Sequence, residues 1–263
     1  MAKSTTIFPA FLTSSGCKHC ANPGGLPFDF SYAYQPIVDI GDRKIFAYEA
    51  LVRGVNGESA MSVLAHVNAD NRYLFDQTCR EKAIGLAAKQ QLPSRLSINF
   101  LPNAIYRPEL CIRTTLLAAE KYNVPLSDII FEAVEGEMVA DGPRLAEILK
   151  EYQKIGFLTA IDDFGAGYAG LNLLADFQPD IVKLDMGLIR AVDTSKPRQS
   201  IVKALVTIAS ELDIMVIAEG VETVGEAQCL SQLGITLMQG YAFGRPLFEN
   251  FTKPDEIDWS ALA

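Results

Sequence analysis

The chain has 263 residues, 49% of them hydrophobic and 21% charged, which suits one large α/β domain or two small ones. The formal net charge of −9 argues against electrostatic binding to a nucleic-acid polymer, although metal ions could bridge an acidic protein to a small phosphate ligand. No apolar run approaches the roughly 20 residues of a transmembrane helix, and the N-terminus lacks the pattern of a secretory signal. We therefore expect a cytoplasmic protein that does not bind a membrane.

Residues 1–30 are expected to form an N-terminal arm, because they are polar, rich in Gly and Pro and without a sustained period. Cys17 and Cys20 form a CxxC pair there, which could be half of a zinc site or a redox pair. The chain has no second CxxC, and outside the arm its one histidine is His66. Two incidental cysteines therefore remain an alternative to a metal-binding or redox pair.

From Phe30 onward, strand-like runs alternate with helical patterns. The runs 32–40 and 44–52 flank a Gly-Asp-Arg turn and predict a β-hairpin. Further strands are expected at 96–101, 129–134, 157–161, 181–184, 214–218 and 237–239. Helices are expected at 60–70, 73–90, 109–122, 142–155 and 198–212, and a last helix, after the strand 214–218, is expected to end at Leu233. Eight strands in this order fit a (β/α)8 barrel, with a doubly wound open sheet as the alternative.

Polar side chains interrupt these strands or follow their carboxyl ends. The set is Glu49, Asn99, Glu132, Asp162, Asp163, Lys183, Glu219 and Gln239. In a closed barrel, the carboxyl ends of the strands meet at one mouth, where ligands bind. Because independent packing accidents would scarcely select one polar group per strand, the set as a whole predicts a site.

Single members of this set also have structural alternatives. Asp162 and Asp163 could cap the next helix, although two adjacent carboxylates repel each other unless a positive charge compensates them. Glu49 could lie on the solvent face of an alternating strand. Asn99 could be a buried amide that serves only to satisfy structural hydrogen bonds.

The set contains five carboxylates and two amides, which are hard oxygen donors that suit Mg²⁺ or Mn²⁺ rather than thiolate-bound zinc. Five carboxylates exceed the charge of one divalent ion, so two ions are expected. Ions about 3.5–4 Å apart are a device for phosphoryl transfer. Lys183 could orient or help deprotonate the attacking water, or stabilise the developing charge. Ca²⁺ is expected to bind and inhibit, because its looser coordination positions a water poorly.

Eight motifs follow one another between residues 31 and 250. They are Gln35-Pro-Ile37, Glu49-Ala-Leu-Val-Arg53, Asn99 in INF, Glu132-Ala-Val-Glu135, Asp162-Asp-Phe-Gly-Ala-Gly-Tyr168, Lys183-Leu-Asp185, Ala218-Glu-Gly-Val-Glu222 and Gln239-Gly-Tyr241. Together they resemble the signatures of EAL-domain phosphodiesterases, which hydrolyse cyclic di-GMP. The resemblance implies a modified TIM barrel with one antiparallel strand, in a domain over 31–255 followed by a short tail at 256–263.

The resemblance also implies a role for each matching residue. The metal ligands would be Glu49, Asn99, Glu132 and Asp162, with Asp163 chiefly on the second ion and Glu219 in the metal and water network. Lys183 would hold the catalytic water, and the product would be linear pGpG. The nucleotide would contact Gln35, Leu51, Arg53 and Pro246. Supporting positions would be Gln239, Glu135, Glu222 and Asp185.

The loop 163–171 resembles the family's regulatory loop, which couples the second-metal site to a dimer interface, so a homodimer is implied. Ala166, Ala169 and Gly170 stand where Thr or Ser are frequent, which affects the loop rather than the carboxylates. The alternative function is that of a catalytically silent EAL domain that binds the nucleotide or a protein partner. Silent members typically lack several of the acids or the lysine, whereas this chain has all of them.

Overall fold

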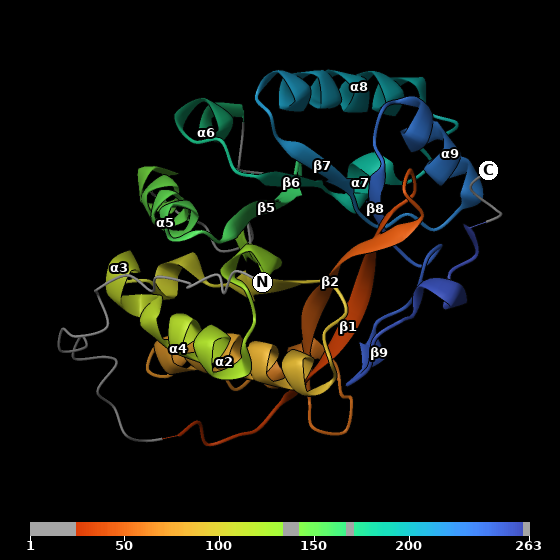
Figure 1. Ribbon diagram of the computed structural model, residues 1–263. Helices are drawn as coiled ribbons and strands as arrows, with labels where there is room; N and C mark the ends of the chain where they lie inside the picture. Colours follow the sequence, from red (N-terminus) through yellow and green to blue (C-terminus); the bar gives the residue numbers. More distant parts are fainter. Residues whose placement is uncertain (1–24, 134–141, 167–170, 260–263) are drawn as a thin grey trace, which may run out of the picture.

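The computed structural model describes residues 25–133, 142–166 and 171–259, which form a closed barrel with helices on its outside (Figure 1). The barrel strands in the described residues are β1 (Ser31–Asp39), β2 (Lys44–Arg53), β3 (Arg95–Phe100), β4 (Ile129–Ala133), β5 (Leu158–Phe164), β6 (Ile181–Leu184), β7 (Met215–Ala218) and β8 (Leu237–Gln239). Neighbours from β2 to β8 are parallel, whereas β1 lies antiparallel to both β2 and β8 and closes the barrel. The predicted modified (β/α)8 barrel with one antiparallel strand is therefore confirmed.

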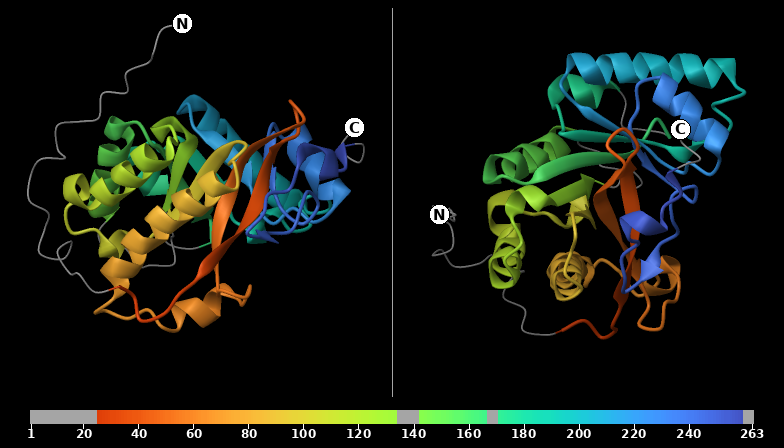
Figure 2. Two further views of the ribbon diagram at one scale, coloured as in Figure 1. Left: turned by 60° about the horizontal axis from the view of Figure 1, so that its bottom comes forward. Right: turned by 45° about the vertical axis from the view of Figure 1, so that its right-hand side comes forward.

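Helices pack around the strands (Figure 2). They are α1 (Ala60–Leu64), α2 (Arg72–Lys89), α3 (Pro108–Cys111), α4 (Arg113–Tyr122), α5 (Gly142–Ile155), α6 (Leu171–Asp176), α7 (Met186–Ile189), α8 (Lys196–Glu211) and α9 (Val224–Gln232). Three short 3₁₀ helices lie within the described residues, at 102–104, 126–128 and 254–256. No helix in the described part of the chain is long and apolar enough to span a membrane.

Several elements differ from the predicted ones. The predicted helix over 60–70 ends at Leu64, because the amide side chains of Asn68 and Asn71 bind nearby backbone N–H groups and so compete with helical hydrogen bonds. The predicted helix over 109–122 is divided at Ile112 into α3 and α4. The short helix α7 and the two-residue strand β9 (Leu247–Phe248), which pairs with β1, carry too few residues to show a period.

The described part of the predicted arm packs against the domain. The ring of Phe28 stacks on His66, with 5.2 Å between ring centroids, and Phe30 is buried against Phe75 of α2. Cys17 and Cys20 lie outside the described residues, as does the end of the predicted tail.

A small apolar cluster fills the barrel interior below its mouth. Its members include Ile37, Ala47, Ile130, Ala160, Ile181, Ile217 and Leu237. A second, larger cluster lies between the strands and the helices. Side chains two positions apart on a strand point to the same face. The polar residue two positions from each of these inner apolar residues therefore also points into the barrel.

Candidate active site

The ammonium group of Lys183 lies among four carboxylates at the carboxyl ends of the strands. Its Nζ atom is 2.7 Å from Oε1 of Glu219, 3.0 Å from Oε2 of Glu132, 3.0 Å from Oδ1 of Asp162 and 3.7 Å from Oε2 of Glu49. The lysine side chain is fully buried, which disfavours its charged form. The four carboxylates outweigh this effect of burial and hold the pKa of Lys183 well above its usual value.

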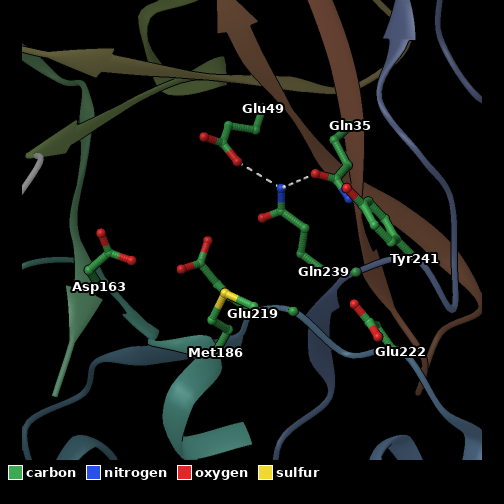
Figure 3. Close-up of a pocket in the computed structure, with 10 residues that line it drawn as sticks. Gln35, Glu49, Asp163, Met186, Glu219, Glu222, Gln239 and Tyr241 are labelled. Carbon is green, nitrogen blue, oxygen red and sulfur yellow. Dashed lines mark hydrogen bonds between the residues drawn. The ribbon is translucent and has the colours of Figure 1, made fainter. Parts of the chain in front are cut away.

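Glu49 is held in place by two amide side chains. Asn99 on β3 donates to Oε1 of Glu49 at 2.8 Å, and Gln239 on β8 donates to Oε2 at 2.7 Å. Gln239 also donates to Oε1 of Gln35 at 3.3 Å, and Figure 3 shows both bonds of Gln239. Glu49 is only 6% exposed, so it does not lie on a solvent face. Asn99 belongs to the same side-chain network as Glu49, and its role as a metal ligand stays a prediction.

Glu132 is completely buried on β4 and accepts a hydrogen bond from the hydroxyl of Ser97 on β3. Burial raises the pKa of Glu132 to about 8, because the nearby ammonium of Lys183 only partly offsets the cost of desolvation. Burial likewise raises the pKa of Glu219 well above its usual value. Both carboxyl groups therefore bind protons more readily than an exposed glutamate does.

Asp162 and Asp163 lie inside β5, beyond the predicted end of this strand at residue 161. The pairing of β5 with β6 is interrupted between Ile161 and Phe164, and Asp163 has a left-handed backbone with φ of 53°. Aspartate tolerates this conformation better than most residues do. Both lie inside the strand, and the first described residue of α6 is Leu171, so neither is adjacent to the described part of that helix.

Asp162, Asp163 and Glu219 each offer an oxygen atom, and these atoms lie within 4.8 Å of one another. The buried Oε1 of Gln239 accepts no hydrogen bond from the described residues and so remains available as a further oxygen donor. Clustered carboxylate and amide oxygens suit a hard divalent cation. The side chains present therefore fit the predicted Mg²⁺ or Mn²⁺.

A pocket of about 250 Å³ opens beside these groups (Figure 3). It is lined by Gln35, Glu49, Asp163, Met186, Glu219, Gly220, Glu222, Gln239, Gly240 and Tyr241. Met186 and Tyr241 are about half exposed and were not predicted as site residues. Each directly follows or closes a predicted motif, and this adjacency is the signal that could have identified them.

The supporting residues have defined contacts. Asp185 caps α7, since its carboxylate accepts from the N–H of Gly187 at 2.8 Å. Glu222 forms an ion pair with Arg190, with 2.8 Å between Nη2 and Oε1 in one of its contacts. Glu135 lies outside the described residues, and the predicted regulatory loop is described only through residue 166 and from residue 171.

Of the four residues predicted to contact the nucleotide, one lines the described pocket and three do not. Gln35 lines the pocket and donates to the carbonyl of Gly244 at 3.1 Å. Leu51, Arg53 and Pro246 are partly buried and are not among the described residues that line it. Arg53 donates to the carbonyl of Val52 at 2.7 Å, and its nucleotide contact stays a prediction.

A family model described as "EAL domain" matches residues 28–246. The blue light- and temperature-regulated antirepressor BluF of Escherichia coli is 33% identical over 217 residues, which cover 81% of this chain and 53% of BluF. Cyclic di-GMP phosphodiesterase PA2567 of Pseudomonas aeruginosa is 28% identical over 239 residues, which cover 88% of this chain and 40% of that protein. The chain thus spans about half, or less, of the length of these curated relatives.

Two solved structures extend this similarity. A standalone versatile EAL protein from Vibrio cholerae O395, in a c-di-GMP bound form, is 55% identical with a TM-score of 0.86, and the match covers 90% of this chain and 99% of that one. Klebsiella pneumoniae BlrP1, in a manganese/cy-diGMP complex, is 35% identical with a TM-score of 0.79, covering 86% of this chain and 58% of BlrP1.

Proposed function

The chain belongs to the EAL domain family, and from this membership and the geometry of its site we propose that it hydrolyses cyclic di-GMP to linear pGpG with the help of Mg²⁺ or Mn²⁺. The observation that carries the proposal is the convergence of Lys183 with four carboxylates at the mouth of the barrel. A relative that is named a cyclic di-GMP phosphodiesterase supports the choice of reaction and substrate.

The residues that would hold two divalent ions are Glu49, Asn99, Glu132, Asp162, Asp163 and Glu219. When bound, such ions would lower the pKa of an attacking water and offset the negative charge of the phosphodiester. Gln239 would keep Glu49 oriented through its hydrogen bond. Arg53 would bind a phosphate oxygen, because the planar guanidinium matches the geometry of phosphate.

Lys183 would hold the attacking water and stabilise negative charge rather than act as a base. The surrounding carboxylates keep the pKa of Lys183 high, so the side chain retains its proton near neutral pH. A charged ammonium donates hydrogen bonds but accepts none. Of the roles that the sequence leaves open to Lys183, orientation of the water therefore fits its surroundings better than deprotonation.

The second candidate function is a silent receptor that binds cyclic di-GMP or a protein partner and signals by that binding. One observation favours it, since the relative BluF is named an antirepressor. Against it, the described site contains every metal-binding acid of the predicted set and the lysine as well.

The two functions are separated by one assay. Purified protein is incubated with cyclic di-GMP and Mn²⁺ or Mg²⁺, pGpG is followed by chromatography, and nucleotide binding is measured in parallel by calorimetry. Formation of pGpG supports the phosphodiesterase. Binding without any linear product in either metal would establish the receptor instead.

The proposal also includes a cytoplasmic homodimer, with no nucleic-acid polymer or membrane as partner. The single domain would span 31–255, close to the 28–246 matched by the family model. Light scattering of the purified chain tests the dimer, and a mass of one protomer at assay concentration would contradict it.

A further inference from the structure

Strand β3 differs from the other strands one layer below the site. On six other strands, the residue two positions before the site side chain is apolar: Ala47, Ile130, Ala160, Ile181, Ile217 and Leu237. On β3 the equivalent residue, two positions before Asn99, is Ser97. It is completely buried, and it shares the inward face of β3 with Asn99. Burying a hydroxyl without a hydrogen bond costs free energy, so a partner for Ser97 is expected.

The partner of Ser97 is a predicted metal ligand on the neighbouring strand. The parallel register aligns Ser97 with Ile130 and Asn99 with Glu132. Across this pair of strands the Ser97 hydroxyl donates to Oε1 of Glu132. The other oxygen, Oε2, lies 3.0 Å from Nζ of Lys183. The two oxygens of Glu132 are therefore not equivalent: Oε1 is engaged by a neutral hydroxyl, and Oε2 faces the centre of the site.

We propose that Ser97 is a specificity-determining residue, which disfavours Ca²⁺ in this site by keeping Oε1 of Glu132 engaged. Ca²⁺ takes about six to eight oxygen ligands and often both oxygens of one carboxylate, whereas Mg²⁺ requires a compact octahedral arrangement. The hydrogen bond from Ser97 occupies one lone pair of Oε1 and fixes the plane of the carboxylate, so it favours cation binding through Oε2 alone over binding through both oxygens. The inference rests on the proposed metal-dependent function and concerns the choice of ion at the same site.

Removing the hydroxyl should change the balance between ions. In the Ser97→Ala variant both oxygens of Glu132 are available, and its carboxylate is less firmly oriented. Loss of an outer contact to a metal ligand typically costs about 10–100-fold in affinity. We expect the affinity for Mn²⁺ to fall about tenfold and that for Ca²⁺ to be unchanged or higher, so the preference for Mn²⁺ falls by at least about tenfold.

The experiment is calorimetric titration of the full, metal-stripped chain with Mn²⁺ alone and Ca²⁺ alone, without nucleotide. Ser97→Thr keeps the hydroxyl, and Ser97→Val has nearly the same shape as the threonine variant but lacks the hydroxyl. If the alanine variant fails to fold, these two variants provide the comparison with and without the hydroxyl. Thr115→Val is the matched control, because Thr115 is a fully buried hydroxyl residue on α4, outside the site.

The inference is supported if the alanine and valine variants lose the preference for Mn²⁺ while the threonine and Thr115 variants retain it. Equal preference in the wild type and in both hydroxyl-free variants overturns the role of Ser97 but leaves the proposed phosphodiesterase intact. A wild-type chain that binds neither ion overturns the metal-dependent function, and this inference with it.

Discussion

Lys183 and Glu219 form the shortest of the four ion pairs at the barrel mouth, with 2.7 Å between Nζ and Oε1. The two residues come from β6 and from the segment directly after β7, which is its parallel neighbour. Three further carboxylates face the same ammonium. Among the described residues of the site, Lys183 therefore supplies the positive charge that faces all four of these acids.

Replacing Lys183 should destabilise the metal-free protein. The Lys183→Met variant leaves buried carboxylates without their counter-charge, so the free energy of unfolding should fall by about 3–5 kcal/mol. Urea denaturation in EDTA at pH 8 measures this loss, and added Mn²⁺ should restore part of it. Lys203→Met on the exposed face of α8 is the control. A loss no larger than that of the control would contradict the role of Lys183.

The stability of the metal-free protein should fall as pH rises from about 5 to about 8. Burial raises the pKa of Glu132 from 4.5 to about 8, so in this window the folded state keeps a proton that the unfolded chain has lost. The slope from one such group reaches about 1.4 kcal/mol per pH unit. The raised pKa of Glu219 acts in the same direction. Lys183 adds no slope, because it is charged in both states below about pH 10.

Urea denaturation in EDTA across this pH range measures the effect. The Glu132→Gln variant should flatten the profile, since the amide does not titrate. Glu120→Gln, on the exposed surface of α4, should leave the slope unchanged. A wild-type profile that rises between pH 5 and pH 8 would show that other groups dominate.

Removing Glu49 should abolish hydrolysis without unfolding the chain. Glu49→Ala deletes a proposed metal ligand that also accepts hydrogen bonds from Asn99 and Gln239. Initial rates of pGpG formation in Mn²⁺ should fall at least about 100-fold, because removal of a ligand exceeds the loss caused by outer contacts. Circular dichroism should remain that of the wild type. Activity retained within a few-fold would refute the assigned role of Glu49.

Calcium should inhibit the reaction. The larger ion accepts irregular coordination, so it occupies the acids while positioning the attacking water poorly. Increasing Ca²⁺ at constant Mn²⁺ should lower the rate of pGpG formation, and Ca²⁺ alone should permit nucleotide binding without product. Full activity in Ca²⁺ alone is the result that this expectation excludes.

A second buried ion pair lies outside the site and should contribute to stability. Nη2 of Arg80 is 2.7 Å from Oδ2 of Asp76 on α2, and both side chains are almost completely buried. Arg80 also donates to the hydroxyl of Tyr152 at 2.8 Å, while Asp76 accepts from the N–H of Leu101 directly after β3. The pair therefore joins α2 to α5 and to the carboxyl end of β3.

The Arg80→Met variant leaves the Asp76 carboxylate buried without its cation, which should cost about 3–5 kcal/mol of the free energy of unfolding. Lys154→Met is the matched control, because it breaks an exposed i,i+3 pair with Glu151 and should cost less than about 1 kcal/mol. Thermal or urea unfolding measures both. Equal losses in the two variants would contradict the importance of burial.

Local patterns in the amino-acid sequence were sufficient to predict the barrel and most residues of the candidate site. Strand periodicity located β1 to β8 within a few residues, because each strand must direct alternate side chains into a core. The polar residues at the strand ends, such as Glu132 and Lys183, were visible because they interrupt apolar runs. Parallel strands share one carboxyl end, so their convergence followed from the strand order.

Which side chains meet between neighbouring strands depends on the tertiary structure, because closure of the barrel fixes how the strands are aligned. Ser97 is an ordinary strand serine in the sequence, and its bond to Glu132 exists because the register of β3 and β4 brings the two together. The left-handed backbone of Asp163 and the position of Tyr241 at the pocket also depend on neighbouring segments. Periodicity states which face a side chain occupies, whereas its partner depends on how strands far apart in the chain are aligned.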